Sequence, residues 1–219
     1  MLDKNVVEAV LFDLDGTLMD TDDQAVEALA RGLQRLHWPC AHRAARRLIM
    51  AFETPGNALM TLVDALGLDA PLATFTDLLR RRRGLRTRAD FRIVTGAKEM
   101  LTALNGRYRL AVVTTRSLSD AEAFLTHYGL RDLFGALVTR ESTGRLKPHP
   151  APIRYAALSL GVPVERCVMV GDTPVDVRAA RRAGAWAVGV LCGFGEREEL
   201  EQAGAHVILE HVSELASLL

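Results

Sequence analysis

The feature that most constrains this chain is a pair of acidic residues placed directly after an apolar run. Residues 6–12 read Val-Val-Glu-Ala-Val-Leu-Phe, a pattern typical of a buried parallel strand. Because side chains alternate along a strand, Asp13 and Asp15 are expected to point to the same side. Two carboxylates at the end of a core strand repel each other and lose hydration. They are tolerated if a cation binds there and one of them holds a proton.

Two kinds of pattern divide the rest of the chain. Residues 19–92 carry apolar residues at helical spacing in four successive segments, with no strand pattern between them. After residue 93, apolar strands expected at 109–114, 136–138, 167–170 and 185–191 alternate with amphipathic helices. This alternation predicts an α/β fold, a doubly wound parallel sheet built from residues 1–18 and 93–219. Residues 19–92 are then an inserted all-helical domain. In such sheets, ligands bind beyond the carboxyl ends of the strands.

Polar residues follow three of the later apolar segments at this expected edge. Thr114 ends its strand, and a hydroxyl there can bind a phosphate oxygen. Lys147 begins Lys-Pro-His-Pro, where the prolines restrict the backbone around a cation. Asp172 and Asp176 come after the strand at 167–170, one helical turn apart. Each signal alone also fits an ordinary strand end, a surface lysine or a helix N-terminus.

Arg116 stands two residues after Thr114. It could provide an extra contact to an anion, but the interpretation we favour from sequence is a solvated arginine at the start of a helix.

Taken together, the Asp13–Thr17 run, Thr114, Lys147 and the Asp172–Asp176 pair resemble the four motifs of the haloacid dehalogenase-like hydrolase superfamily, in their order. Most members transfer phosphoryl groups, and the resemblance is to the phosphoglycolate phosphatase and β-phosphoglucomutase-like subfamily with a helical cap. By resemblance, the catalytic residues are Asp13, Asp15, Thr114 and Lys147, and the phosphate contacts come from Gly16, Thr114, Thr115 and Lys147. By resemblance, Mg²⁺ is held by the Asp13 carboxylate, the Asp15 backbone carbonyl and the Asp172 carboxylate, with Asp176 acting through water or as support. Many relatives have Asn where this chain has Thr115.

The resemblance implies a magnesium-dependent phosphatase that hydrolyses a small phosphomonoester through an aspartyl-phosphate. Dehalogenases lack the second acid of the first motif, so Asp15 disfavours that activity. A phosphomutase of the β-phosphoglucomutase type stays open, as does, less favoured, a binding module without catalysis. The cap ends in a basic segment, Arg80–Arg83, Arg86, Arg88 and Arg92, and for most of these arginines we favour a solvated helix face. One or two of them could still contact an acidic substrate. Phosphoglycolate is therefore the first substrate expected, and a sugar phosphate the next.

Charge and cysteine content limit the partners. Lys plus Arg and Asp plus Glu each total 27, so no global field favours nucleic acid or an anionic membrane. The expected partner is a small phosphorylated metabolite. Cys40, Cys167 and Cys192 are widely spaced, which disfavours a disulfide framework and fits a reducing cytoplasm. The first apolar run is broken by Glu8 and is too short for a membrane span. No sustained heptad pattern specifies an oligomeric state.

Overall fold

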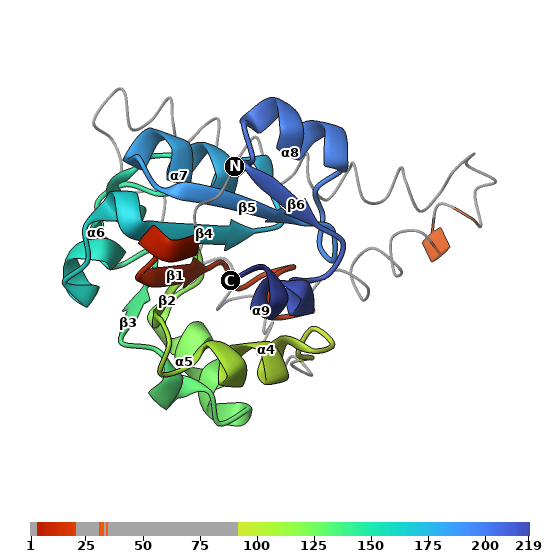
Figure 1. Ribbon diagram of the computed structural model, residues 1–219. Helices are drawn as coiled ribbons and strands as arrows, with labels where there is room; N and C mark the ends of the chain where they lie inside the picture. Colours follow the sequence, from red (N-terminus) through yellow and green to blue (C-terminus); the bar gives the residue numbers. More distant parts are fainter. Residues whose placement is uncertain (1–3, 21–30, 33, 35–91) are drawn as a thin grey trace. The chain divides into compact units, whose positions relative to one another are not determined.

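A parallel β-sheet forms the centre of the protein in the computed structural model, which describes residues 4–20, 31–32, 34 and 92–219 (Figure 1). Its six strands are β1 (Ala9–Phe12), β2 (Arg109–Val113), β3 (Ala136–Val138), β4 (Cys167–Gly171), β5 (Trp186–Val190) and β6 (Val207–Leu209). Their order is β3-β2-β1-β4-β5-β6, and every neighbouring pair is parallel. The chain therefore builds outward from β1 on one side and from β4 on the other, which confirms the predicted doubly wound sheet.

Helices cover both faces of the sheet because β1 is apolar on both. Its four residues are fully buried: Val10 and Phe12 face one layer, and Ala9 and Leu11 face the other. The first layer contains α4 (Ala97–Leu104), α5 (Leu118–His127) and α9 (Leu215–Leu218); the second contains α6 (Ala151–Leu160), α7 (Pro174–Ala183) and α8 (Arg197–Ala203) (Figure 1). Four short 3₁₀ turns complete the described core: η1 (Lys4–Val6), η2 (Arg131–Leu133), η3 (Val164–Arg166) and η4 (Val212–Glu214).

The strand register brings the polar strand ends together. Leu11 of β1 lies opposite Ala111 of β2 and Met169 of β4, so the three strands finish at the same edge. The order of the sheet reverses between β1 and β4, and an open α/β sheet binds ligands outside the strand ends at such a reversal. The residues that follow β1, β2 and β4 are therefore in the position that the sequence predicts for a site.

The predicted helical insertion falls almost entirely outside the described residues. Residues 1–22 and 91–219 belong to one compact unit. At its border, Met19 and Ile93 form an antiparallel bridge, and the Asp20 N–H donates to the Arg92 carbonyl at 2.8 Å. The chain thus leaves and re-enters this unit at adjacent backbone positions. The insertion's helices, its exact boundaries of 19–92 and its role as a cap stay predictions, as do contacts from Arg80–Arg83, Arg86 and Arg88.

None of the helices in the described part of the chain combines the length and apolar character needed to cross a membrane.

Candidate active site

Asp13 lies at the switch point between β1 and β4. Its backbone N–H donates to the carbonyl of Val170 at 2.9 Å, so the hydrogen bonds of the sheet fix this residue's position. The side chain is almost completely buried. Asp13 is therefore a carboxylate held by the main chain at the edge where parallel sheets bind ligands.

Lys147 is buried among the acidic groups of this edge. Its Nζ donates to Asp13 Oδ1 at 2.7 Å, to Asp176 Oδ1 at 2.6 Å and to the Val113 carbonyl at 2.9 Å. Burial on its own lowers the pKa of Lys147, but the charges of Asp13 and Asp176 raise it above its ordinary value. The ammonium stays charged at neutral pH and is aimed at the Asp13 carboxylate.

Asp172 and Asp176 join Asp13 from the end of β4 and the first turn of α7. Asp172 Oδ1 accepts from the Thr17 hydroxyl at 3.3 Å, and Oδ2 accepts from the Phe194 N–H at 2.7 Å. Asp176 Oδ2 accepts from the Thr173 hydroxyl at 2.6 Å, which orients it at the helix N-terminus. Asp13, Asp172 and Asp176 can each offer one oxygen, all within 4.8 Å of one another. The structure therefore brings three of the four predicted metal-site residues together.

The donor set of this cluster fits a divalent cation. Burial, and then the charge of Asp176, raise the pKa of Asp13 to about 7, although Lys147 opposes the shift. A cation among the three carboxylates would offset that repulsion, and Mg²⁺ and Ca²⁺ both prefer oxygen ligands. Asp176, already bound to Lys147 and Thr173, is placed to support the other groups.

Asp15 has a different partner. Arg116 Nε donates to Asp15 Oδ2 at 2.7 Å and to Oδ1 at 2.9 Å, and Nη2 donates to Oδ1 at 2.6 Å. The Arg116 side chain is only 25% exposed. The interpretation of Arg116 as a solvated arginine is therefore wrong, because a bidentate ion pair holds it beside the first motif. Burial lowers the pKa of Arg116, and Asp15 raises it to a net value above the ordinary one.

Thr114 directly follows β2, at the edge of the sheet where Asp13 follows β1. The Thr114 N–H donates to the Val138 carbonyl at 2.9 Å, and its Oγ1 accepts from the Arg116 N–H at 3.1 Å. The buried hydroxyl is thus already oriented by the chain that follows it. Thr115 is exposed.

Gly16 is required by its surroundings. It has a φ of +72°, and a Cβ at this position would lie 2.3 Å from Asp172 Oδ2. Its N–H donates to the Met19 carbonyl at 2.8 Å, which closes the turn after Asp15. Glycine therefore allows the first and fourth motifs to approach each other.

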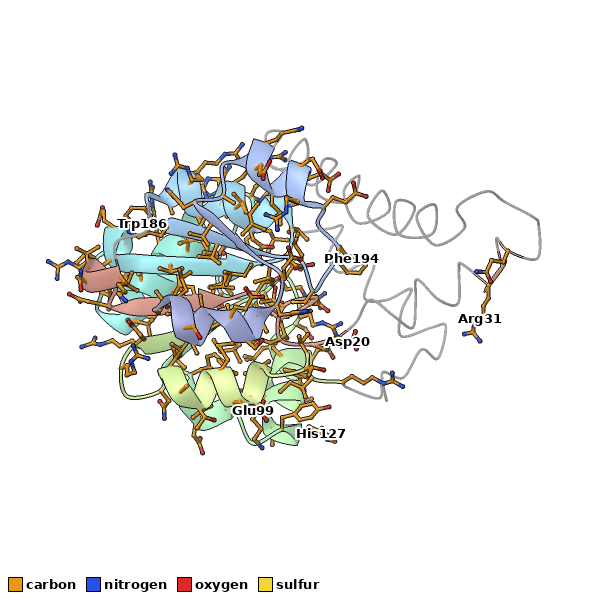
Figure 2. The ribbon with its side chains drawn as sticks, turned by 45° about the vertical axis from the view of Figure 1, so that its right-hand side comes forward. Asp20, Arg31, Glu99, His127, Trp186 and Phe194 are labelled. Carbon is orange, nitrogen blue, oxygen red and sulfur yellow. The ribbon has the colours of Figure 1, made fainter. Side chains whose placement is uncertain are left out.

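A loop that the sequence reasoning missed encloses Asp172. Residues 192–195 read Cys-Gly-Phe-Gly after β5, and a Cβ on Gly193 would lie 2.1 Å from Asp172 Oδ2. A Cβ on Gly195 would lie 2.0 Å from the Asp172 carbonyl oxygen. Figure 2 shows Phe194 at the same end of the sheet as Asp20, opposite Trp186 at the start of β5. The paired glycines after a strand were the available sequence signal for this close approach.

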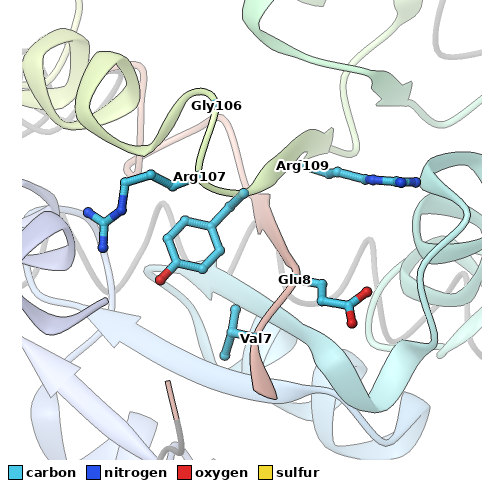
Figure 3. A pocket seen from close by; sticks show the side chains of 6 residues that line it. Val7, Glu8, Gly106, Arg107 and Arg109 are labelled. Carbon is cyan, nitrogen blue, oxygen red and sulfur yellow. The ribbon is translucent and has the colours of Figure 1, made fainter. Parts of the chain in front are cut away.

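A pocket of about 420 Å³ lies at the other end of the sheet, where β1 and β2 begin (Figure 3). Its lining residues are Val7, Glu8, Gly106, Arg107, Tyr108 and Arg109. None of the residues of the four motifs contributes to it. This pocket is therefore separate from the motif residues at the carboxyl edge of the sheet.

Comparison with known proteins agrees with this arrangement. A family model for haloacid dehalogenase-like hydrolases matches residues 10–190. The phosphoglycolate phosphatase of Colwellia psychrerythraea is 32% identical, with 95% of each chain covered. The probable phosphatase IndB of Dickeya dadantii is 31% identical over 94% of this chain and 90% of its own. A solved hydrolase from Pseudomonas syringae superposes with a TM-score of 0.72 at 29% identity, with 96% of each chain covered.

The chain belongs to the haloacid dehalogenase-like hydrolases. Within that family it is an enzyme of the phosphatase class, as its relatives indicate.

Proposed function

We propose that this protein is a magnesium-dependent phosphatase that hydrolyses a small phosphomonoester through a phosphorylated Asp13. One observation carries the proposal. The Asp13 carboxylate is fixed at the switch point of the sheet, 2.7 Å from the buried Lys147 ammonium and beside Asp172 and Asp176. A carboxylate aimed out of a parallel sheet, with cationic support already in place, is suited to attack an electrophilic phosphorus.

The reaction would proceed in two steps. Asp13 attacks phosphorus, so that an aspartyl P–O bond forms while the bond to the substrate alcohol breaks. Asp15, protonated at that stage, donates its proton to the departing oxygen. It then accepts a proton from a water molecule, which attacks phosphorus and releases Asp13 and inorganic phosphate.

Lys147 and Thr114 would stabilise the phosphoryl group during both steps. Lys147 contributes a fixed ammonium whose other contacts, to Asp176 and the Val113 carbonyl, prevent it from moving away. Thr114 contributes a hydroxyl oriented by the Arg116 N–H. Gly16 and Thr115 would add contacts to the phosphate oxygens from the two neighbouring loops.

Mg²⁺ would be held by the Asp13 and Asp172 carboxylates and the Asp15 carbonyl, with Asp176 in support. When bound, it supplies positive charge to the phosphoryl oxygens. Asp176 also orients Lys147, because one of its oxygens accepts from the Lys147 ammonium and the other from the Thr173 hydroxyl.

Phosphoglycolate is the first substrate to test, since a relative of nearly equal length carries that activity in its name. A sugar phosphate is the next. A phosphomutase of the β-phosphoglucomutase type would use the same core but return the phosphoryl group to another hydroxyl. The balanced charge of the chain supports a small phosphorylated metabolite as the partner, and its widely spaced cysteines support a cytoplasmic location. The helical insertion is proposed to cover the site during turnover.

The experiment is a phosphate-release screen over small phosphomonoesters, with Mg²⁺ or with EDTA, for the wild type and Asp13→Asn. We expect metal-dependent release from wild type alone, because an amide is a poor nucleophile and a poor metal ligand. Circular dichroism of Asp13→Asn checks that its fold is intact. Equal release by the two proteins would contradict the proposal, and rearranged sugar phosphate without free phosphate would indicate the phosphomutase.

A further inference from the structure

We propose that Arg116 is a specificity-determining residue that binds an acidic group on the alcohol part of the substrate, close to the ester oxygen. The inference rests on the proposed function and narrows its substrate class to short phosphorylated acids. It places this recognition in the core rather than in the helical insertion.

The guanidinium of Arg116 has donors left for a second anion. Nε and Nη2, along one edge of the guanidinium, donate to the Asp15 carboxylate oxygens at N···O distances of 2.6–2.9 Å. Nη1 makes no hydrogen bond to any residue in the described part of the chain. Since a guanidinium carries five N–H groups in a fixed plane, it can hold Asp15 with one edge and a carboxylate with another.

The backbone of Arg116 is fixed before any substrate binds. Its N–H donates to Thr114 Oγ1 at 3.1 Å, and its carbonyl accepts from the Arg140 N–H at 3.2 Å. The next residue, Ser117, caps α5 by accepting from the Asp120 N–H at 3.3 Å. This anchoring resembles a preorganised binding group and not a flexible surface arginine, so little ordering entropy would be lost on binding.

The position of Asp15 limits where the second acid can be. In the proposed mechanism, the Asp15 carboxyl reaches the ester oxygen, and Arg116 is bound to that same carboxyl. The guanidinium is therefore one carboxyl group away from the ester oxygen. A carboxylate joined to the ester oxygen by one or two carbons can reach the Arg116 guanidinium. A carboxylate at the end of a long chain lies too far from the ester oxygen to make this contact. Planar, bidentate recognition of carboxylate favours arginine over lysine.

A rival interpretation gives Arg116 only the task of positioning Asp15. The two interpretations predict different effects of removing Arg116 on acidic and neutral substrates. A residue that only positions Asp15 affects every phosphomonoester alike, whereas a residue that also binds the acid lowers kcat/KM more for acidic substrates than for neutral ones.

The test measures kcat/KM for phosphoglycolate, 3-phosphooxypropanoate, 6-phosphooxyhexanoate and the neutral 2-hydroxyethyl phosphate. Wild type is compared with Arg116→Gln, Arg116→Lys and Arg154→Gln. Arg154 is exposed on α6 and provides the same change in charge away from the site. The readout is each acid's kcat/KM divided by that of 2-hydroxyethyl phosphate. This ratio is independent of the fraction of enzyme that is folded, so a poorly folding variant still gives an answer.

We expect wild type and Arg154→Gln to prefer the two short acids by about tenfold to a hundredfold, the usual value of a charge-assisted hydrogen bond. Arg116→Gln should bring the ratio close to one, mainly through KM, and Arg116→Lys should keep part of the preference. The long acid should show no preference in any protein.

A preference that survives in Arg116→Gln, or a wild type that treats short acids and the neutral ester equally, would overturn the inference and leave the proposed phosphatase intact. Failure of wild type to release phosphate from any ester with Mg²⁺ would overturn the proposed function and the inference with it.

Discussion

At the scale of single residues, the site is an arrangement of buried charges whose protonation is shared. Asp13 lies between the Lys147 ammonium and two other carboxylates. Burial raises its pKa to about 7, well above the ordinary value of 3.8. Asp15, by contrast, is paired with Arg116 at the rim. The two acids of the first motif therefore have different surroundings: Asp13 is buried beside an ammonium and two carboxylates, and Asp15 is bound to a guanidinium.

The shifted pKa of Asp13 predicts how stability depends on pH in the metal-free protein. The folded state holds a proton on Asp13 between about pH 4 and pH 7, where the unfolded chain has released it. The contribution of Asp13 is therefore fully present below pH 4 and is lost as the pH rises through about 7. Asp13→Asn should flatten the fall in Tm across this window in EDTA. Parallel curves for wild type and variant would show that Asp13 does not titrate there.

Asp15→Asn tests the proton donor. Steady-state phosphate release should fall by about 10²–10⁴-fold, the usual value of general acid–base catalysis. The loss should be smaller for a nitrophenyl phosphate, whose leaving group needs little protonation. Undiminished turnover of an alkyl phosphate would exclude Asp15 as the acid and base.

At the scale of elements, the site is made by loops that approach β1, β2 and β4 closely. The loop at 192–195 passes so near Asp172 that a Cβ on Gly193 or Gly195 would lie within 2.1 Å of an Asp172 oxygen. Its Phe194 N–H donates to Asp172 Oδ2 at 2.7 Å. This loop therefore orients a carboxylate that would hold the metal, although it carries no acidic residue itself.

Gly193→Ala tests that role. The new methyl would lie 2.1 Å from Asp172 Oδ2, so the loop or the carboxylate must move. We expect about a tenfold to hundredfold loss of Mg²⁺ affinity, typical of disturbed support around a metal ligand. The matched control is Gly144→Ala, where a Cβ meets nothing within 4 Å. If activity depends on Mg²⁺ concentration in the same way in Gly193→Ala and Gly144→Ala, the loop does not position Asp172.

The sequence alone was sufficient for the core strands that carry the motifs but not for all their contacts. Apolar runs ending in Asp13, Thr114 and Asp172 predicted both the strands and the edge where their side chains meet, because parallel strands share one carboxyl end. The Arg116–Asp15 ion pair joins residues 101 positions apart, and no local pattern specifies a partner at that distance. The approach of Gly193 to Asp172 likewise depends on how β5 lies beside β4.

At the scale of the whole molecule, the same buried charges link the fold to the chemistry. Lys147 reaches from the segment before α6 to groups at the ends of β1 and β2 and in α7, so one ammonium connects four parts of the core. Its removal would leave Asp13 and Asp176 buried without that cation. Metal binding and folding are therefore expected to be coupled.

Lys147→Met measures this coupling. Breaking a buried ion pair by removing one partner costs about 3–5 kcal/mol, so the free energy of unfolding in EDTA should fall by that amount. Saturating Mg²⁺ should recover part of the loss, because a cation can take over the role of the ammonium, while activity should stay low. Lys98→Met, at an exposed position on α4, should change the unfolding free energy little. A stable, metal-insensitive Lys147→Met protein would contradict the coupling.

The central claim is that the phosphoryl group passes through Asp13, and chemical trapping tests it most directly. Asp15→Asn, which slows hydrolysis of the intermediate, is mixed with Mg²⁺ and a nitrophenyl phosphate, whose leaving group needs little protonation. The mixture is quenched in acid and reduced with borohydride. Reduction converts an aspartyl-phosphate to homoserine, which peptide mass spectrometry locates in the sequence. We predict homoserine at position 13 only when substrate and metal are both present. Phosphate release by wild type without any modified Asp13, or with the label on another acidic residue, would contradict the mechanism.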